Sequence, residues 1–254
     1  MKKFYFIALA LAVFISNVRA ITAIVNPNAT KPVAVATNQP PLWESTLSFG
    51  LTLTRGNSDS ILTDAAIKAH RNNLTNEVTL SLEGTYGKDH AVKNNESLHG
   101  IGQYNHLFSE RFYGFARGDG FHDGIADLVY RFTLSPGVGY YFLKDKETTL
   151  AVEAGPSYVL EKLDGSRENY AAARVAERFQ RKWNDRTRIW ENVEFLPQFD
   201  KEDNFLMNAE VGVEAPLTKR ISLSVILQDN YINLPAPGRQ RNDLKLISGL
   251  VYKF

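Results

Sequence analysis

Leu244-Lys245-Leu246-Ile247-Ser248-Gly249-Leu250-Val251-Tyr252-Lys253-Phe254 is the stretch that decides the fold. Counting back from Phe254 in steps of two gives a mostly apolar set, and the alternate set carries the two lysines. A period-2 strand with one apolar face and an aromatic last residue is typical of the final strand of an outer-membrane barrel. We therefore expect Leu250, Tyr252 and Phe254 to form a C-terminal assembly signal that barrel-assembly machinery would read.

The N-terminus has the features of an export signal. Lys2 and Lys3 precede an apolar run over residues 4–15, and Val18-Arg19-Ala20 has the small residues of a cleavage site. This pattern predicts a signal peptide over residues 1–20, because its apolar core is too short for a membrane-spanning helix. We therefore expect export through a cleaved signal peptide. Cysteine is absent from the whole chain, so neither a lipid anchor on cysteine nor a disulfide is expected.

Charge and hydropathy narrow the class of protein further. Loss of residues 1–20 would remove three basic residues and leave 26 basic against 28 acidic ones, a net charge of −2. Nucleic-acid binding is not expected from such a balance. No later stretch approaches 18 uninterrupted apolar residues, and only helices or closed barrels satisfy every backbone group in lipid. A membrane protein with this sequence would have to be a barrel.

The body of the chain repeats the alternating pattern. Residues 21–42 contain four prolines and no clear period, so we expect a flexible periplasmic segment there. The alternating stretches lie at 46–54, 61–70, 78–86, 97–106, 111–118, 127–142, 148–160, 169–181, 186–197, 204–215, 220–231 and 242–254. Their even number predicts an all-β, antiparallel transmembrane barrel of about twelve strands over residues 43–254, located in the outer membrane.

The expected connections supply a second indication. Those after even-numbered strands are short, whereas most of those after odd-numbered strands are longer, at 88–96, 119–126, 161–168 and 232–241. The first connection, around 56–59, is a short exception. Short periplasmic turns alternating with longer external loops are a property of such barrels.

Three segments resemble a known family. They are Leu53 to Ser58, Tyr130 to Phe142 and Pro235 to Asp243, and the likeness extends over about residues 43–254. The chain resembles the family of unknown function that includes salt-induced outer-membrane proteins of Gram-negative bacteria. The resemblance implies an outer-membrane location and a barrel, and it implies no reaction.

The charges expected on the inward face are the strongest functional indication. The candidate lumen-lining residues are Glu83, Arg131, Glu153, Arg174, Arg178, Glu194, Glu210 and Lys245. They would either pair across the lumen and fill it, or line a narrow water path for ions or small solutes. Their mixed signs argue against strong ion selectivity. Trp190 is the one aromatic expected in the lumen, and the other strand-end aromatics fit interfacial girdles.

The remaining alternatives concern chemistry at the rim. The five histidines form no metal-type pair, so no metal site and no cofactor are expected. An outer-membrane hydrolase would use rim groups such as His122 and Asp119, but no Gly-x-Ser-x-Gly elbow is present. We expect a monomer, not an enzyme, in contact with outer-membrane lipids. The leading interpretation is a narrow pore or passive envelope barrel for ions or small solutes, and the resemblance alone implies a link to osmotic stress. The alternatives are the hydrolase and a plugged structural or adhesive barrel.

Overall fold

The computed structural model describes residues 43–54, 60–184, 186–201 and 203–254. The predicted signal peptide (1–20), the segment 21–42 and the expected short first connection around 56–59 lie outside these described residues. The described residues form twelve strands. They are β1 (Trp43–Thr54), β2 (Ser60–Asn72), β3 (Asn76–Asp89), β4 (Val92–Leu107), β5 (Phe112–Asp123), β6 (Leu128–Lys144), β7 (Thr148–Leu163), β8 (Ser166–Asn184), β9 (Thr187–Pro197), β10 (Phe205–Pro216), β11 (Ile221–Ile232) and β12 (Asn242–Lys253).

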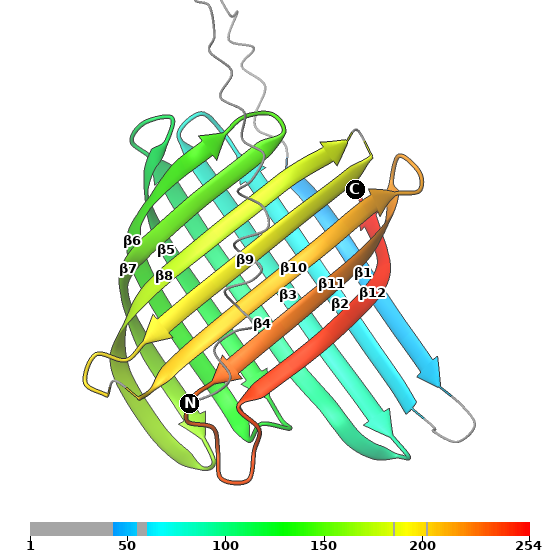
Figure 1. Cartoon of the computed structure of the whole chain (residues 1–254), viewed down its shortest axis with the longest axis vertical. Coiled ribbons are helices and arrows are strands. Elements are labelled where there is room, and N and C mark those ends of the chain that lie inside the picture. The colour runs from blue at the N-terminus through cyan, green and yellow to red at the C-terminus, as the bar shows by residue number, and fades with distance from the viewer. Residues whose placement is uncertain (1–42, 55–59, 185, 202) are drawn as a thin grey trace, which may run out of the picture. The chain divides into compact units, whose positions relative to one another are not determined.

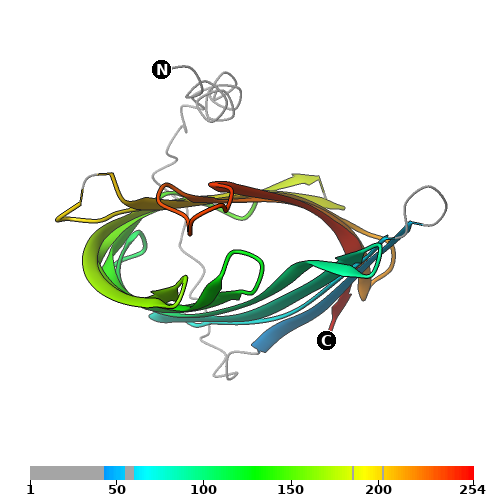
Figure 2. The ribbon, with the colours of Figure 1, turned by 90° about the horizontal axis from the view of Figure 1, so that it is seen from below.

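Every strand pairs with its neighbour in sequence, and β12 pairs with β1 to close the barrel. All the pairings are antiparallel. The predicted antiparallel barrel of about twelve strands is therefore confirmed. We call the end that carries Trp43 and Phe254 the terminal end, which is uppermost in Figure 1, and the opposite end the loop end. Seen from the loop end, the ring of strands is flattened (Figure 2).

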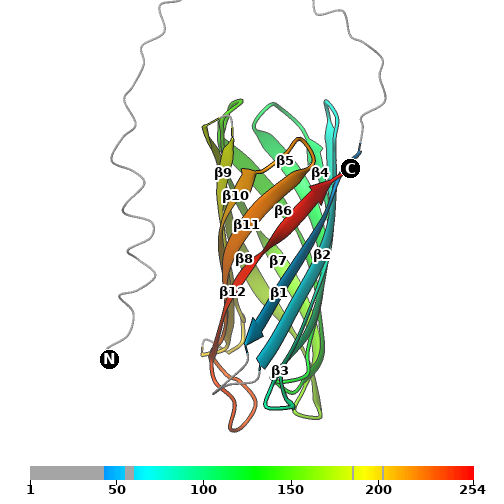
Figure 3. The same ribbon diagram turned by 90° about the vertical axis from the view of Figure 1, so that its right-hand side faces the viewer.

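The closing pair is the shortest ladder in the barrel. β1 and β12 share four paired positions, Thr46–Phe49 against Leu250–Lys253. β1 pairs with β2 over twelve positions, and β11 pairs with β12 over eleven. Figure 3 shows β12 and β1 side by side on one face of the barrel. We call this junction the seam.

Alternation along the strands separates an apolar outer face from a polar inner face. Side chains such as Leu47, Phe49, Leu82, Phe132 and Leu246 are exposed on the outside, with exposed fractions between 45% and 66%. Burial of these leucines and phenylalanines against lipid is favourable, and their strand partners satisfy the backbone groups. No helix in the described part of the chain is long and apolar enough to cross a membrane.

The prediction of long loops is wrong for three segments. Residues in 88–96, 119–126 and 161–168 lie mostly in strands, so connection length does not sort by strand parity. His90-Ala91 and Asp164-Gly165 are two-residue turns in which both residues have positive φ. Such turns match the right-handed twist of the strands and allow them to continue past the apolar belt. The connections 198–204 and 233–241 remain the longest ones described at the loop end.

Leu128 lies inside the barrel, although alternation with Tyr130, Phe132 and Leu134 predicts that it faces outward. Leu128 is fully buried, whereas the next residue, Val129, is 49% exposed. The pairing of β6 shifts between Leu128 and Tyr130, which is a β-bulge, and Asp127 just before it has a positive φ of 57°. Because one extra residue reverses the alternation, the simple period-2 assignment fails at this strand end.

Candidate functional site

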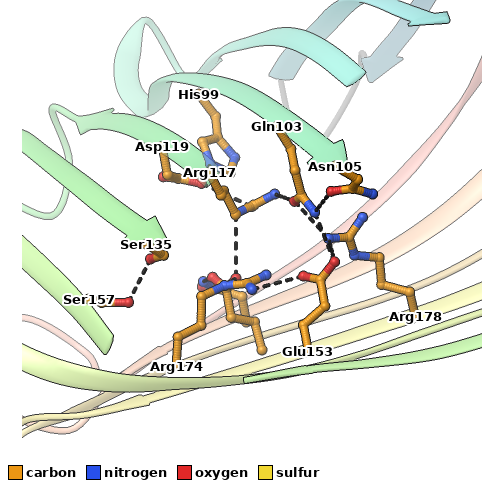
Figure 4. A network of polar contacts seen from close by, with 12 residues as sticks. His99, Gln103, Asn105, Arg117, Asp119, Ser135, Glu153, Ser157, Arg174 and Arg178 are labelled. Atoms are coloured by element: carbon orange, nitrogen blue, oxygen red, sulfur yellow. Dashed lines mark hydrogen bonds and ion pairs between the residues drawn. The ribbon is translucent and has the colours of Figure 1, made fainter. Parts of the chain in front are cut away.

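Inward-facing polar side chains converge on Glu153 of β7, whose side chain is fully buried. Arg174 Nη1 donates to Glu153 Oε2 over 2.8 Å. Gln103 Nε2 and the Tyr113 hydroxyl donate to Glu153 Oε1 over 2.8 Å and 2.9 Å, and Arg178 donates to the same oxygen. Four donors from three other strands therefore hold one buried carboxylate inside the barrel, and Figure 4 shows three of them, Gln103, Arg174 and Arg178, around Glu153.

The contacts continue from Glu153 toward the loop end. Arg174 Nε donates to Glu194 Oε2 over 2.5 Å, and Arg117 Nε lies 3.6 Å from the same oxygen. Arg117 Nη2 also donates to Asp119 Oδ2 over 3.2 Å, and His99 Nε2 lies 3.0 Å from that oxygen. Charges of opposite sign thus alternate along this half of the lumen.

The contacts also continue toward the terminal end. Gln103 Nε2 donates to Asn105 Oδ1 over 2.9 Å, and Asn105 Nδ2 donates to Glu77 Oε2 over 3.0 Å. The Tyr141 hydroxyl donates to Glu77 Oε2 over 2.6 Å, and Lys144 Nζ lies 3.4 Å from Glu77 Oε1. We call the whole connected set, from His99 to Glu77, the lumen network.

Side chains of strands that are not neighbours meet across the flattened barrel in three contacts. Arg178 of β8 reaches Gln103 of β4, with Nη2 donating to Oε1 over 2.6 Å. Gln228 of β11 reaches Glu83 of β3, with Nε2 donating to Oε1 over 3.3 Å. Lys245 of β12 also donates to Ser97 Oγ of β4 over 3.2 Å. The lumen is therefore spanned by polar side chains at these points.

Glycines on the inner face make room for two large rings. A side chain at Gly139 would overlap the Tyr113 ring, which lies flat over the strand on its way to Glu153. A side chain at Gly212 would likewise overlap the ring of Trp190. Trp190 Nε1 donates to Glu210 Oε1 over 2.6 Å, so this ring is held in the lumen by a carboxylate. Only a residue without a Cβ allows this close approach.

A small cavity lies in the lumen on the loop-end side of Glu153. Its volume is about 50 Å³, and its lining includes Arg117, Asp119, Arg174, Glu194 and Tyr231. A water molecule needs roughly 10–15 Å³ on this measure, so the cavity holds only a few. Charged side chains and apolar ones such as Leu196 and Leu206 line this cavity together, so side chains set the width of the lumen at this level.

A loop is tied across the loop-end mouth. Arg239 Nε, in the connection 233–241, donates to Asp127 Oδ2 over 2.7 Å, in the connection 124–127. Figure 2 shows these two connections extending inward from opposite walls. The hydrogen bond from Arg239 holds the pKa of Asp127 below its usual value of 3.8. Ala236 in the same loop is buried, so the loop folds against the barrel instead of projecting from it.

The eight charges expected in the lumen all lie on the inward faces of their strands, and the structure divides them among four sets of contacts. Glu153, Arg174, Arg178 and Glu194 belong to the lumen network. Glu83 and Glu210 meet through Gln228, and Lys245 contacts Ser97. Arg131 pairs separately with Glu161 over 2.6 Å. Sequence reasoning missed the roles of Gln103, Tyr113 and Arg117, although their alternation along β4 and β5 could have indicated their inward direction.

The pair His122 and Asp119 expected for a hydrolase is not assembled. Asp119 contacts His99 in the lumen, whereas His122 Nδ1 lies 2.9 Å from the Val129 carbonyl oxygen. Residues 119 and 122 differ in strand parity and point to opposite faces of β5. The structure therefore does not bring these two rim residues together. Within the described residues, no group of three or more His, Cys, Asp or Glu side chains is arranged to hold a metal ion.

A closed antiparallel barrel with an apolar outside and a charged, hydrogen-bonded inside defines the class of the protein: it has the fold of an outer-membrane β-barrel. The family described as "Protein of unknown function, DUF481" matches residues 47–254, and the chain belongs to this family. No curated protein matches the chain.

Solved structures with similar folds are outer-membrane barrels. The NanC porin is 7% identical with a TM-score of 0.52, and the match covers 82% of this chain and 98% of that one. An outer membrane channel from Pseudomonas putida F1 is 11% identical with a TM-score of 0.48, covering 89% of this chain and all of that one. The translocator domain of the autotransporter NalP from Neisseria meningitidis is 12% identical with a TM-score of 0.46, covering 86% and 90%. At these identities the likeness concerns the fold alone.

Proposed function

We propose that the protein is a narrow, weakly selective pore of the outer membrane for ions and small solutes. The observation that carries this proposal is the continuous polar lining from Glu77 at the terminal end to His99 near the loop end. A barrel that served only as a wall would gain as much from an apolar interior, because buried charges are costly unless they are paired and hydrated.

The lining also limits what could pass. The Gln103–Arg178 and Glu83–Gln228 contacts span the lumen, and the cavity beside them holds only a few waters. Four inward arginines (Arg117, Arg131, Arg174 and Arg178) face four carboxylates (Asp119, Glu153, Glu161 and Glu194) in ion pairs. Balanced charge of this kind favours small solutes of either sign over one ion type.

The same spanning contacts support a second candidate, a plugged barrel with a structural or adhesive role. If the side-chain contacts persist in the membrane, they block the lumen at its narrowest level. A link to osmotic stress is part of the proposal only through the family resemblance in the sequence. Neither the lumen nor the comparisons adds support to that link.

Ion selectivity tests the pore directly. We expect the purified barrel in a planar bilayer to show discrete conductance steps, with a reversal potential close to zero in a KCl gradient. Neutralising an inward acid by E210Q should shift the reversal potential toward anion selectivity, and neutralising an inward base by R178Q should shift it toward cation selectivity. Identical reversal potentials for the wild type and both variants would show that these charges do not line the conducting path.

A further inference from the structure

The terminal end of the barrel carries a surplus of basic side chains. Eight of them form no ion pair with a described carboxylate: Arg71, Arg111, Lys146, Arg181, Lys182, Arg186, Lys219 and Arg220. The exposed carboxylates described at this end are fewer, namely Glu44, Glu110, Asp145 and Glu147. At the loop end, by contrast, exposed carboxylates such as Asp164, Glu168 and Asp243 stand among the bases. The surplus of positive charge is therefore confined to one end.

Two of these arginines lie beside aromatic rings on the lipid-facing side of the seam. Trp43 of β1 and Arg71 of β2 are directly paired, and the Arg71 guanidinium lies over the Trp43 ring at 5.9 Å. Arg220, which precedes β11, donates from Nη1 to the Tyr252 hydroxyl over 3.4 Å. Trp43 and Tyr252 are 46% and 37% exposed on the outer face.

The two arginine–aromatic pairs belong to one continuous patch. The Lys253 amide donates to the Arg220 carbonyl over 2.8 Å, and the Phe254 amide donates to the Ser45 carbonyl over 3.1 Å. The ends of β11, β12, β1 and β2 are thus adjacent, with Arg220 on one flank and Arg71 on the other. We call the patch formed by Arg71, Trp43, Tyr252, Phe254 and Arg220 the seam clamp.

The chemistry of the seam clamp fits a lipid phosphate. Outward Trp and Tyr side chains mark the level of the lipid headgroups in a barrel. A guanidinium at that level is matched to phosphate oxygens in charge and in fork geometry. The Arg71 Nε atom is buried and has no hydrogen-bond partner among the described residues, so the Nη groups at the end of the guanidinium are the donors that a phosphate would meet.

We propose that Arg71 and Arg220 bind the phosphate of an anionic phospholipid in the leaflet at the terminal end of the barrel. Cationic clusters at the membrane surface attract anionic lipids. A headgroup held by both arginines bridges the closing junction, where only four strand positions pair. The lipid therefore stabilises the barrel at its shortest ladder. The inference depends on the barrel being embedded in lipid, and it is independent of whether the lumen conducts.

The test compares thermal unfolding of the reconstituted full-length mature chain in two vesicle compositions, phosphatidylcholine alone and phosphatidylcholine with phosphatidylglycerol. We expect phosphatidylglycerol to raise the unfolding midpoint of the wild type by several degrees. R71Q/R220Q should keep the midpoint of the wild type in phosphatidylcholine and lose the increase. R220Q alone, which changes an exposed turn residue, should lose part of it. The matched control is K88Q/K162Q, which removes two cations at the loop end.

Three results would overturn the proposal. The first is a wild-type midpoint that does not respond to phosphatidylglycerol. The second is an increase that R71Q/R220Q and R220Q retain in full, or that K88Q/K162Q loses to the same extent. The third is an equal increase when inorganic phosphate is added to phosphatidylcholine vesicles, because the ligand would then be a free anion and not a lipid headgroup.

Discussion

Glu153 shows how one buried carboxylate can organise the interior of a barrel. It accepts hydrogen bonds from Arg174, Arg178, Gln103 and Tyr113, which come from β8, β4 and β5. Arg174 has a second carboxylate partner in Glu194, whereas Glu153 is the one hydrogen-bond acceptor of the Tyr113 hydroxyl among the described residues. Removal of the Glu153 carboxylate would therefore leave buried donors without an acceptor.

We expect E153A to destabilise the folded barrel by roughly 3–5 kcal/mol, because loss of one partner leaves buried charge uncompensated. The measurement is the urea midpoint of the reconstituted protein, followed by tryptophan fluorescence. E168A is the matched control, since Glu168 is an exposed carboxylate on the neighbouring strand β8. A loss of stability no larger than that of E168A would contradict the role assigned to Glu153.

The sequence predicts whether a side chain faces the lumen or the lipid, but it does not predict which other side chains it contacts. Alternation along β7 and β8 places Glu153, Arg174 and Arg178 on the inner face, as the structure does. Gln103 lies 50 residues from Glu153 and 75 from Arg178, and nothing local in the sequence indicates that the flattened barrel brings them together. Leu128 shows the opposite failure, because a bulge invisible in the alternation reverses its direction.

At the scale of elements, the twelve strands follow from alternation, whereas the turns depend on backbone conformations that the pattern hides. Asp164-Gly165 has the composition of a tight hairpin turn, and it lay inside a segment expected to be a loop. His90-Ala91 has no such composition, although both residues adopt positive φ. The charged residues on either side of these turns are typical of loops, but in the structure they belong to the ends of the strands.

The connection 233–241 should loosen in acid. Because the pKa of Asp127 is depressed in the folded state, its ion pair with Arg239 is fully present above the usual value of 3.8 and is lost as the pH falls through the lower folded value. A fluorophore on Q240C reports the motion, since the chain has no native cysteine. We expect its anisotropy to be high at neutral pH and to fall below about pH 3.8.

R239Q provides the control for this titration. Without the guanidinium, the loop has lost its tie to Asp127, so the labelled variant should show low anisotropy over the whole pH range. Wild-type anisotropy that does not change in acid would contradict the claim that the Arg239–Asp127 pair holds the loop. An R239Q variant whose anisotropy changes with pH as that of the wild type does would contradict it as well. High salt at neutral pH should act in the same direction as acid, because both side chains are 41% exposed and the pair is screened.

At the scale of the whole molecule, the barrel combines an apolar belt, a charge-balanced lumen and a basic terminal end. The fold class could be predicted from the sequence because period-2 alternation repeats over the chain and because lipid permits few alternatives. The width of the lumen could not, since it depends on how far the barrel flattens and on which long side chains meet. Arg178 and Gln103 decide that width by reaching each other from β8 and β4.

The most direct test of the account is the single-channel conductance of Q103S/R178S beside that of the wild type. Both substitutions shorten side chains that span the lumen, and Glu153 keeps its hydrogen bonds from Arg174 and Tyr113, so the fold is retained. We predict small, discrete steps for the wild type and steps several-fold larger for the variant. A folded wild type and a folded variant that are both silent, or that conduct equally, would contradict the claim that these side chains form the narrowest part of a pore.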